Sequence, residues 1–82
     1  MKELMVKAFW DEKAEVWVAE SEDVPGLITE ATTMESLISK LKVLIPELLE
    51  ANGVIFEING TEQIPFHLLS ERSEKIQRPG HV

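Results

Sequence analysis

The sequence contains no cysteine, only two histidines, and four widely separated glycines. Without thiols there is no disulfide framework and no thiolate chemistry. Neither His67 nor His81 stands at a spacing from other ligand residues that is typical of a metal site. The glycines do not form a phosphate-binding loop, and no serine has a histidine–acid arrangement beside it. We therefore expect no catalytic residue, no metal site and no cofactor, and we expect that the protein is not an enzyme.

Long hydrophobic runs are also missing. No apolar stretch of the sequence approaches the ~18 residues that a membrane span needs. The first five residues, Met1 to Met5, lack the continuous apolar core and the small-residue cleavage site of a signal peptide. Together with the lack of cysteine, these absences favour a cytoplasmic protein with no membrane partner.

Basic residues are scarce, with 8 Lys and Arg against 15 Asp and Glu, which gives a net charge of −7. Residues 1–60 hold twelve carboxylates and five lysines, so the folded part carries the whole excess. A surface of this sign repels phosphate, and we expect no direct binding of nucleic acid. The charge suits a basic protein partner, although an acidic surface can equally serve solubility alone.

What the sequence does contain is one long amphipathic stretch between Thr32 and Gly53. Thr32 and Glu35 stand at the spacing of a capping box, and Gly53 is the residue type that ends a helix with positive φ. Pro46 lies off the apolar stripe, which predicts a kinked single helix of about 18 residues. The stripe itself recurs in steps of three and four at Met34, Leu37, Ile38, Leu41, Leu44, Ile45, Leu48 and Leu49.

Three strands are expected before this helix. Leu4–Trp10 and Ala14–Glu20 alternate as a hairpin in which Trp10 and Trp17 can be neighbours, although the register is not fixed by the sequence. Both faces of the first strand are largely apolar, which predicts an interior position in the sheet or a second face that meets another subunit. Val24-Pro25-Gly26 predicts a type II turn into a short third strand, Leu27–Ala31.

After the helix, Val54–Ile58 is strand-like and Asn59-Gly60 is a turn signal. Ile64, Phe66 and Leu68 alternate as a last strand, and Pro65 predicts that this strand lies at an edge of the sheet. Residues 70–82 are expected to form a flexible C-terminal tail, in which Arg72, Lys75 and Arg78 are solvated because they alternate with acids and no aromatic residue follows.

These elements predict a two-layer α+β domain over residues 1–69, with the order β-β-β-α-β(-β) and one helix packed on a small sheet. The other sheet face then carries either Met5, Phe9 and Trp17, or Leu4, Val6 and Trp10. An uncovered apolar face of this kind predicts a homodimer or another protein partner.

Carboxylates gather before the Pro-Gly turn. Glu20, Glu22 and Asp23 can in principle hold a divalent cation, which would fit a remnant metal-dependent nuclease or hydrolase. However, such sites usually also draw a carboxylate from a helix, and here Glu35 is expected to cap the helix while Glu47 and Glu50 lie off its apolar stripe. Solvated acids, without metal, are the interpretation we favour.

The run from Asp23 to Leu37, with its acid, Pro-Gly corner, threonine and Thr-x-Glu helix start, resembles the signature of HicB-type antitoxin domains. The preceding hairpin and the helix extend the resemblance over roughly residues 4–52. Glu15–Ala19, Ile45–Leu49 and Asn52-Gly53 are also similar to a small uncharacterised bacterial family within this fold group. The sequence departs from the HicB pattern at Ala31-Thr32 and at Ser36-Leu37, and its last 13 residues are too few for the usual DNA-binding domain.

The resemblance implies a fold with a degraded RNase H-like topology. Proteins of this family are often dimeric through the sheet, and they bind and block a small basic ribonuclease toxin. On this basis we expect a non-enzymatic protein-binding domain whose partner surface includes Glu20, Glu22, Asp23 and Glu30. A stand-alone dimeric module with another ligand is the alternative.

Overall fold

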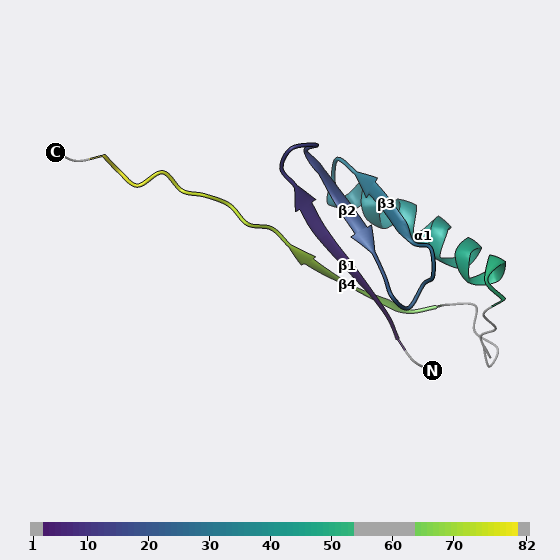
Figure 1. Cartoon of the computed structure of the whole chain (residues 1–82). Helices are drawn as coiled ribbons and strands as arrows, with labels where there is room; N and C mark the ends of the chain where they lie inside the picture. The colour runs from purple at the N-terminus through teal and green to yellow at the C-terminus, as the bar shows by residue number, and fades with distance from the viewer. Residues whose placement is uncertain (1–2, 54–63, 81–82) are drawn as a thin grey trace.

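The computed structural model describes residues 3–53 and 64–80 and shows a four-stranded sheet with one helix (Figure 1). The elements follow one another as β1 (Leu4–Asp11), β2 (Val16–Glu20), β3 (Ile28–Ala31), α1 (Met34–Ala51) and β4 (Phe66–Glu71). The predicted α+β class and the order β-β-β-α-β are confirmed. The strand expected over residues 54–58 and the turn at 59–60 lie outside the described residues.

The strand order in the sheet is β3-β2-β1-β4. β1, β2 and β3 pair antiparallel, as short connections allow, whereas β4 returns after the helix and pairs parallel to β1. β1 is therefore interior and β4 lies at an edge, as both were predicted to be. Pro65 precedes β4 directly, where its missing N–H breaks no ladder.

The hairpin register sets Trp10 opposite Trp17, and their rings lie 5.5 Å apart at 64°, an edge-to-face contact. The predicted neighbourhood of the two tryptophans is thus confirmed. Since Trp10 alternates with Ala8 and Val6, which are buried under the helix, both indoles lie on the helix side of the sheet.

The apolar stripe of α1 forms the core with the inner face of the sheet. Leu37, Leu41, Ile45 and Leu49 are buried in α1, and they pack in one cluster with Leu4, Val6, Ala8, Ala19, Val24, Leu27 and Ala31. Pro46 is exposed within a single helix of 18 residues, as predicted. Burying a Leu side chain stabilises the fold by ~2 kcal/mol, so the four buried side chains of this stripe contribute substantially to the stability of the domain.

The predicted capping box is wrong by one residue. The N-cap is Thr33, whose Oγ1 accepts a hydrogen bond from the Ser36 N–H at 3.1 Å. β3 ends at Ala31, and the chain uses both threonines to turn from strand into helix, so α1 begins one position later than the spacing implied. Glu35 is consequently the second helical residue and lies in the first turn, where its negative charge interacts favourably with the helix dipole. Gly53 does follow the helix with φ of +70°, as predicted.

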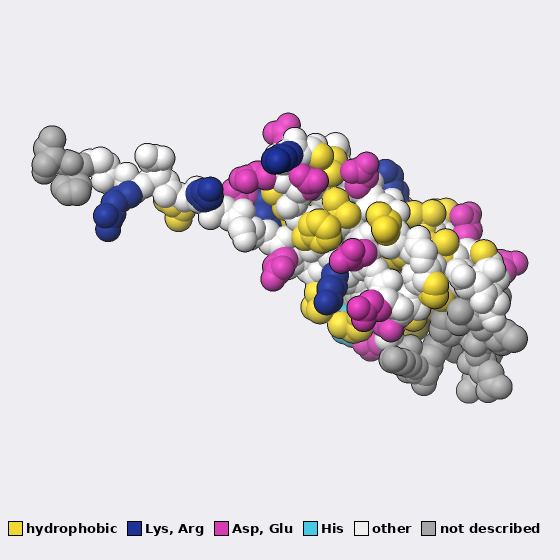
Figure 2. Space-filling view, in the orientation of Figure 1, with side chains coloured by type: hydrophobic (Ala, Val, Ile, Leu, Met, Phe, Trp, Pro, Cys, Tyr) yellow, Lys and Arg dark blue, Asp and Glu magenta, His cyan; other side chains and the backbone are white. Residues whose placement is uncertain are grey.

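The sheet face that turns away from α1, which we call the open face, has no layer over it among the described residues. Figure 2 looks onto this face and shows hydrophobic side chains among carboxylates. Met5 and Phe9 lie there, 40% and 39% exposed, so the first of the two predicted faces is right for β1. Trp17 does not lie with them, because the hairpin register turns it to the helix side. Alternation along the strands gives the open face Met5, Lys7, Phe9, Asp11, Val16, Val18, Glu20, Ile28, Glu30, His67, Leu69 and Glu71.

The C-terminal segment leaves the body of the domain. β4 includes Ser70 and Glu71, two residues beyond the expected start of the tail. Residues 72–80 then run as an extended chain away from the sheet (Figure 1), so the molecule measures 66 × 21 × 20 Å.

Candidate functional site: an acidic hollow on the open face

A hollow of about 570 Å³ lies on the open face where β1 begins, β2 ends and β3 starts. Glu20, Glu22 and Asp23 line it together with Lys7, and Met5 and Ile28 add apolar walls. We call this site the acidic hollow. It brings three of the four predicted partner residues together, and Lys7 is the single cation among the lining residues that the structure describes.

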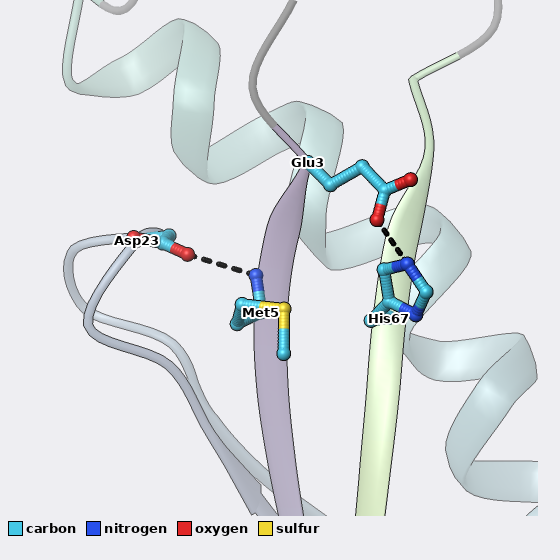
Figure 3. Close-up of polar contacts among 4 residues, drawn as sticks. All are labelled: Glu3, Met5, Asp23 and His67. Carbon is cyan, nitrogen blue, oxygen red and sulfur yellow. Dashed lines mark hydrogen bonds and ion pairs between the residues drawn. The ribbon is translucent and has the colours of Figure 1, made fainter.

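Asp23 and Ser21 hold the edge of the hollow by bonding to the backbone of β1. The ladder between β1 and β2 stops at Lys7 and Glu20, so Met5 has no β2 residue opposite it. Instead, the Met5 N–H donates to Asp23 Oδ2 at 2.8 Å (Figure 3), and the Ser21 hydroxyl donates to the Met5 carbonyl at 2.6 Å. Two side chains thus replace the missing strand, and Asp23 has a structural role in addition to its charge.

Hydrogen bonds attach the Pro-Gly turn to the end of α1. Leu27 N–H donates to Val24 O at 3.1 Å, and Gly26 has φ of +85°, which confirms the predicted turn geometry. The Asn52 amide donates both to Pro25 O at 3.2 Å and to Leu48 O at 2.8 Å. With Val24 and Leu27 buried in the core, the turn cannot move independently of the helix.

The charges of the hollow are on exposed or half-exposed side chains that are available to a partner. Glu20 lies opposite Lys7 in the register, while Glu22 is exposed on the connection that follows β2. Glu30 is exposed on the same face but further along β3, opposite Val18, and does not line the hollow. The acidic surface therefore extends from the hollow along the outer strand β3.

The three carboxylates share one hollow without forming a metal site. In the described ranges, 3–53 and 64–80, no three His, Asp or Glu side chains come together as a metal-binding group. Glu20, Glu22 and Asp23 therefore do not form the divalent-cation site that the sequence suggested as one possibility.

Sequence reasoning missed a cluster at the opposite end of the sheet. The Arg72 guanidinium lies over the Trp10 ring, 4.1 Å from the ring centroid, and its distance from the Trp17 centroid is 5.7 Å. Arg72 also contacts the carboxylate of Glu74. Arg72 had been assigned to a solvated tail. The contact follows from the parallel register, which sets Phe9 opposite Glu71 and so brings the next residue, Arg72, to Trp10. No local sequence pattern signalled it, because it depends on the pairing of β4 with β1.

His67 lies on the sheet surface, between Phe66 and Leu68 in β4. It is exposed on the open face, and its Nε2 contacts the carboxylate of Glu3, the residue before β1 (Figure 3). This contact joins the start of β1 to β4 across the parallel pair and takes no part in the acidic hollow.

None of the helical residues that the structure describes forms a stretch both long and apolar enough to pass through a bilayer.

Comparison with known proteins identifies relatives without giving a function. No curated protein matches the chain. A solved structure, a hypothetical protein from the extremely thermophilic bacterium Thermus thermophilus, is 49% identical and superposes with a TM-score of 0.69. The match covers 94% of this chain and 100% of that one. The model of a domain family of unknown function, DUF1902, matches residues 3–78, which is nearly the whole sequence. The expected likeness to an uncharacterised domain family is confirmed, and this chain belongs to the DUF1902 family.

Proposed function

We propose that this protein is a non-enzymatic binding domain that takes a basic protein partner on its open face, through the acidic hollow and Glu30. The observation that carries this proposal is the hollow itself, where three carboxylates stand beside exposed apolar side chains on a sheet face without a covering layer among the described residues. Ile28, at 75% exposure, is the most open of these apolar side chains. Exposed apolar surface with a charged rim is typical of protein interaction sites.

The electrostatics of this face favour a partner rich in Lys and Arg. Net charge of −7 attracts such a protein over long range and raises its association rate. In the complex, Glu20 and Glu22 would accept charge-assisted hydrogen bonds from the partner's cations, while Met5 and Ile28 would be covered by its apolar side chains. Asp23 would contribute charge while it continues to hold Met5.

The resemblance to HicB-type antitoxin domains indicates which basic protein to expect, a small ribonuclease toxin. A ribonuclease holds RNA phosphates with Lys and Arg, and these are the groups that the acidic hollow would bind. Binding would therefore block access of RNA by occupying the same cations. Within the signature run Asp23–Leu37, the first five residues mostly fix the Pro-Gly turn. The support for binding therefore comes from the acidic surface more than from the signature.

The test is affinity purification from the native host at low salt with three versions of the chain. The wild type is compared with Glu20→Lys/Glu22→Lys, and with Glu47→Lys/Glu50→Lys on α1 as the matched control. Both variants change the net charge by the same amount and replace exposed residues. We expect a small basic protein with the wild type and with the control, and its loss with the hollow variant.

The purified partner then allows the ribonuclease step to be tested. We expect the partner alone to cleave RNA and cleavage to stop on addition of the wild-type chain. If the partner binds through the hollow but does not cleave RNA, the proposed binding site is supported and the proposed antitoxin function is refuted.

A further inference from the structure

The outer edge of β4 is a strand edge that nothing covers in the part of the chain that the structure describes. β1 pairs with one side of β4, and the strand order ends there. β4 is six residues long, and its outward N–H and C=O groups form a template for another strand. Leu69 and His67 on its open face, and half-buried Phe66 and Leu68 on its helix side, would all lie beside such a strand.

Residues 72–80, which we call the basic arm, continue the line of β4 beyond the sheet (Figure 1). Arg72 fixes the root of the arm by lying over Trp10, and from there the arm departs from its own body. Ile76 in the middle of the arm is 93% exposed. The backbone N–H and C=O groups of an extended segment that lies outside the sheet are free to pair with another strand.

The charge of the arm is opposite to that of the body. Residues 72–82 carry three cations and one carboxylate, net +2, whereas residues 1–71 carry fourteen carboxylates and five lysines, net −9. Figure 2 shows the blue side chains of the arm standing apart from the magenta-rich body. The arm of one molecule is therefore attracted to the body of another.

We propose that two copies of this chain form a symmetric dimer in which each basic arm pairs antiparallel with the outer edge of β4 of the other copy. Nine extended residues reach ~30 Å, so the arm is long enough to follow the whole of a six-residue strand, which spans ~20 Å. A two-fold axis perpendicular to the sheet makes the exchange reciprocal and joins two four-stranded sheets into one.

The same symmetry keeps both helices on one side of the joined sheet. Strand alternation from Arg72, which lies on the helix side over Trp10, places Ile76 on that side too. There Ile76 would meet the half-buried Phe66 and Leu68 of the other copy. The acidic hollow lies at the β2–β3 end of the sheet and stays open in this dimer, so the arm exchange and the binding of a basic partner are independent.

Sedimentation equilibrium of the full chain tests the dimer. We compare the wild type with Ile76→Asp, with a chain that ends at Glu71, and with Val43→Asp, the matched control. Val43 is also an exposed apolar residue, at 59%, but lies on α1. We expect a wild-type dimer, an unchanged dimer for Val43→Asp, and at least a tenfold weaker association for the other two. A monomeric wild type, or equal association of all four chains, would overturn the proposal.

Amide hydrogen exchange separates this interface from any other. In the proposed dimer, alternate amides of residues 72–80 exchange slowly, and their protection disappears on dilution and in Ile76→Asp. If the wild type is a dimer and its arm amides exchange at the rate of an unstructured peptide, a different interface forms the dimer. The measurement stands even if the truncated chain does not fold, because it needs only the wild type and Ile76→Asp.

The two proposals can fail separately. If the wild type forms the arm-exchanged dimer but no basic protein binds to it, only the proposed function is refuted.

Discussion

At the scale of single residues, the acidic hollow depends on side chains that have a structural role beside their charge. Asp23 accepts from the Met5 N–H at a point where β1 has run past the end of β2. This contact joins residues 18 apart in sequence, and only the folded hairpin brings them together. The sequence shows the charge of Asp23 but not its bond, because local patterns do not specify such distant contacts.

Asp23→Ala is expected to lower the free energy of unfolding by about 1 kcal/mol, because the Met5 N–H loses a charged hydrogen-bond acceptor that no β2 residue replaces. Urea denaturation measures this loss. Glu22→Ala is the control, since Glu22 is the exposed neighbour in the same hollow, and we expect a change within about 0.5 kcal/mol. Equal effects of the two substitutions would show that the bond to Met5 contributes nothing.

Gly26 is a second residue whose role is conformational. Its φ of +85° is unfavourable for any side chain, and a Cβ there would lie 3.7 Å from Leu48 Cδ2, an ordinary contact. Gly26→Ala should therefore lose about 1 kcal/mol through backbone strain alone. Gly80→Ala serves as the control, since its Cβ would meet open space and its φ is not in the left-handed region. Thermal unfolding of both variants distinguishes strain from the general effect of adding a methyl group, and two unchanged midpoints would contradict this account of the turn.

At the scale of elements, the helix was the most predictable part of the chain. Its apolar period, exposed Pro46 and closing Gly53 are local properties, and all appear in α1 as expected. The start of the helix was not predictable to the residue, because Thr32 and Thr33 are both good caps and the choice depends on where β3 ends. The face of Trp17 was likewise decided by hairpin register, which two short alternating strands do not specify.

Thr33→Ala should therefore cost about 1 kcal/mol of stability, while Thr32→Ala, one residue earlier and also exposed, should cost much less. The two variants have the same composition, so chemical denaturation compares the position of the cap alone. A larger loss for Thr32→Ala would restore the capping box that the spacing first indicated.

At the scale of the whole molecule, the sheet presents two unlike borders. The acidic hollow lies toward β3. The edge of β4, which nothing covers among residues 3–53 and 64–80, lies at the other side with the basic arm. The parallel return of β4 beside β1 creates this separation, and no local pattern predicted it. The acidic composition was visible in the sequence, whereas the gathering of Glu20, Glu22 and Asp23 in one hollow, with Glu30 outside it, follows from the strand pairing.

The most direct test of the central claim is the affinity of the co-purified basic partner for the two charge-reversal variants, measured by titration calorimetry at one salt concentration. The account predicts that Glu20→Lys/Glu22→Lys binds at least tenfold more weakly than the wild type, a loss of about 1.4 kcal/mol or more. Glu47→Lys/Glu50→Lys should stay close to the wild type, because Glu47 and Glu50 lie on α1 and do not line the hollow. Both variants change the net charge equally, so a difference between them reports the contribution of the hollow. If both variants lose affinity equally, the hollow is not the binding site and only net charge attracts the partner; if neither does, the partner binds elsewhere.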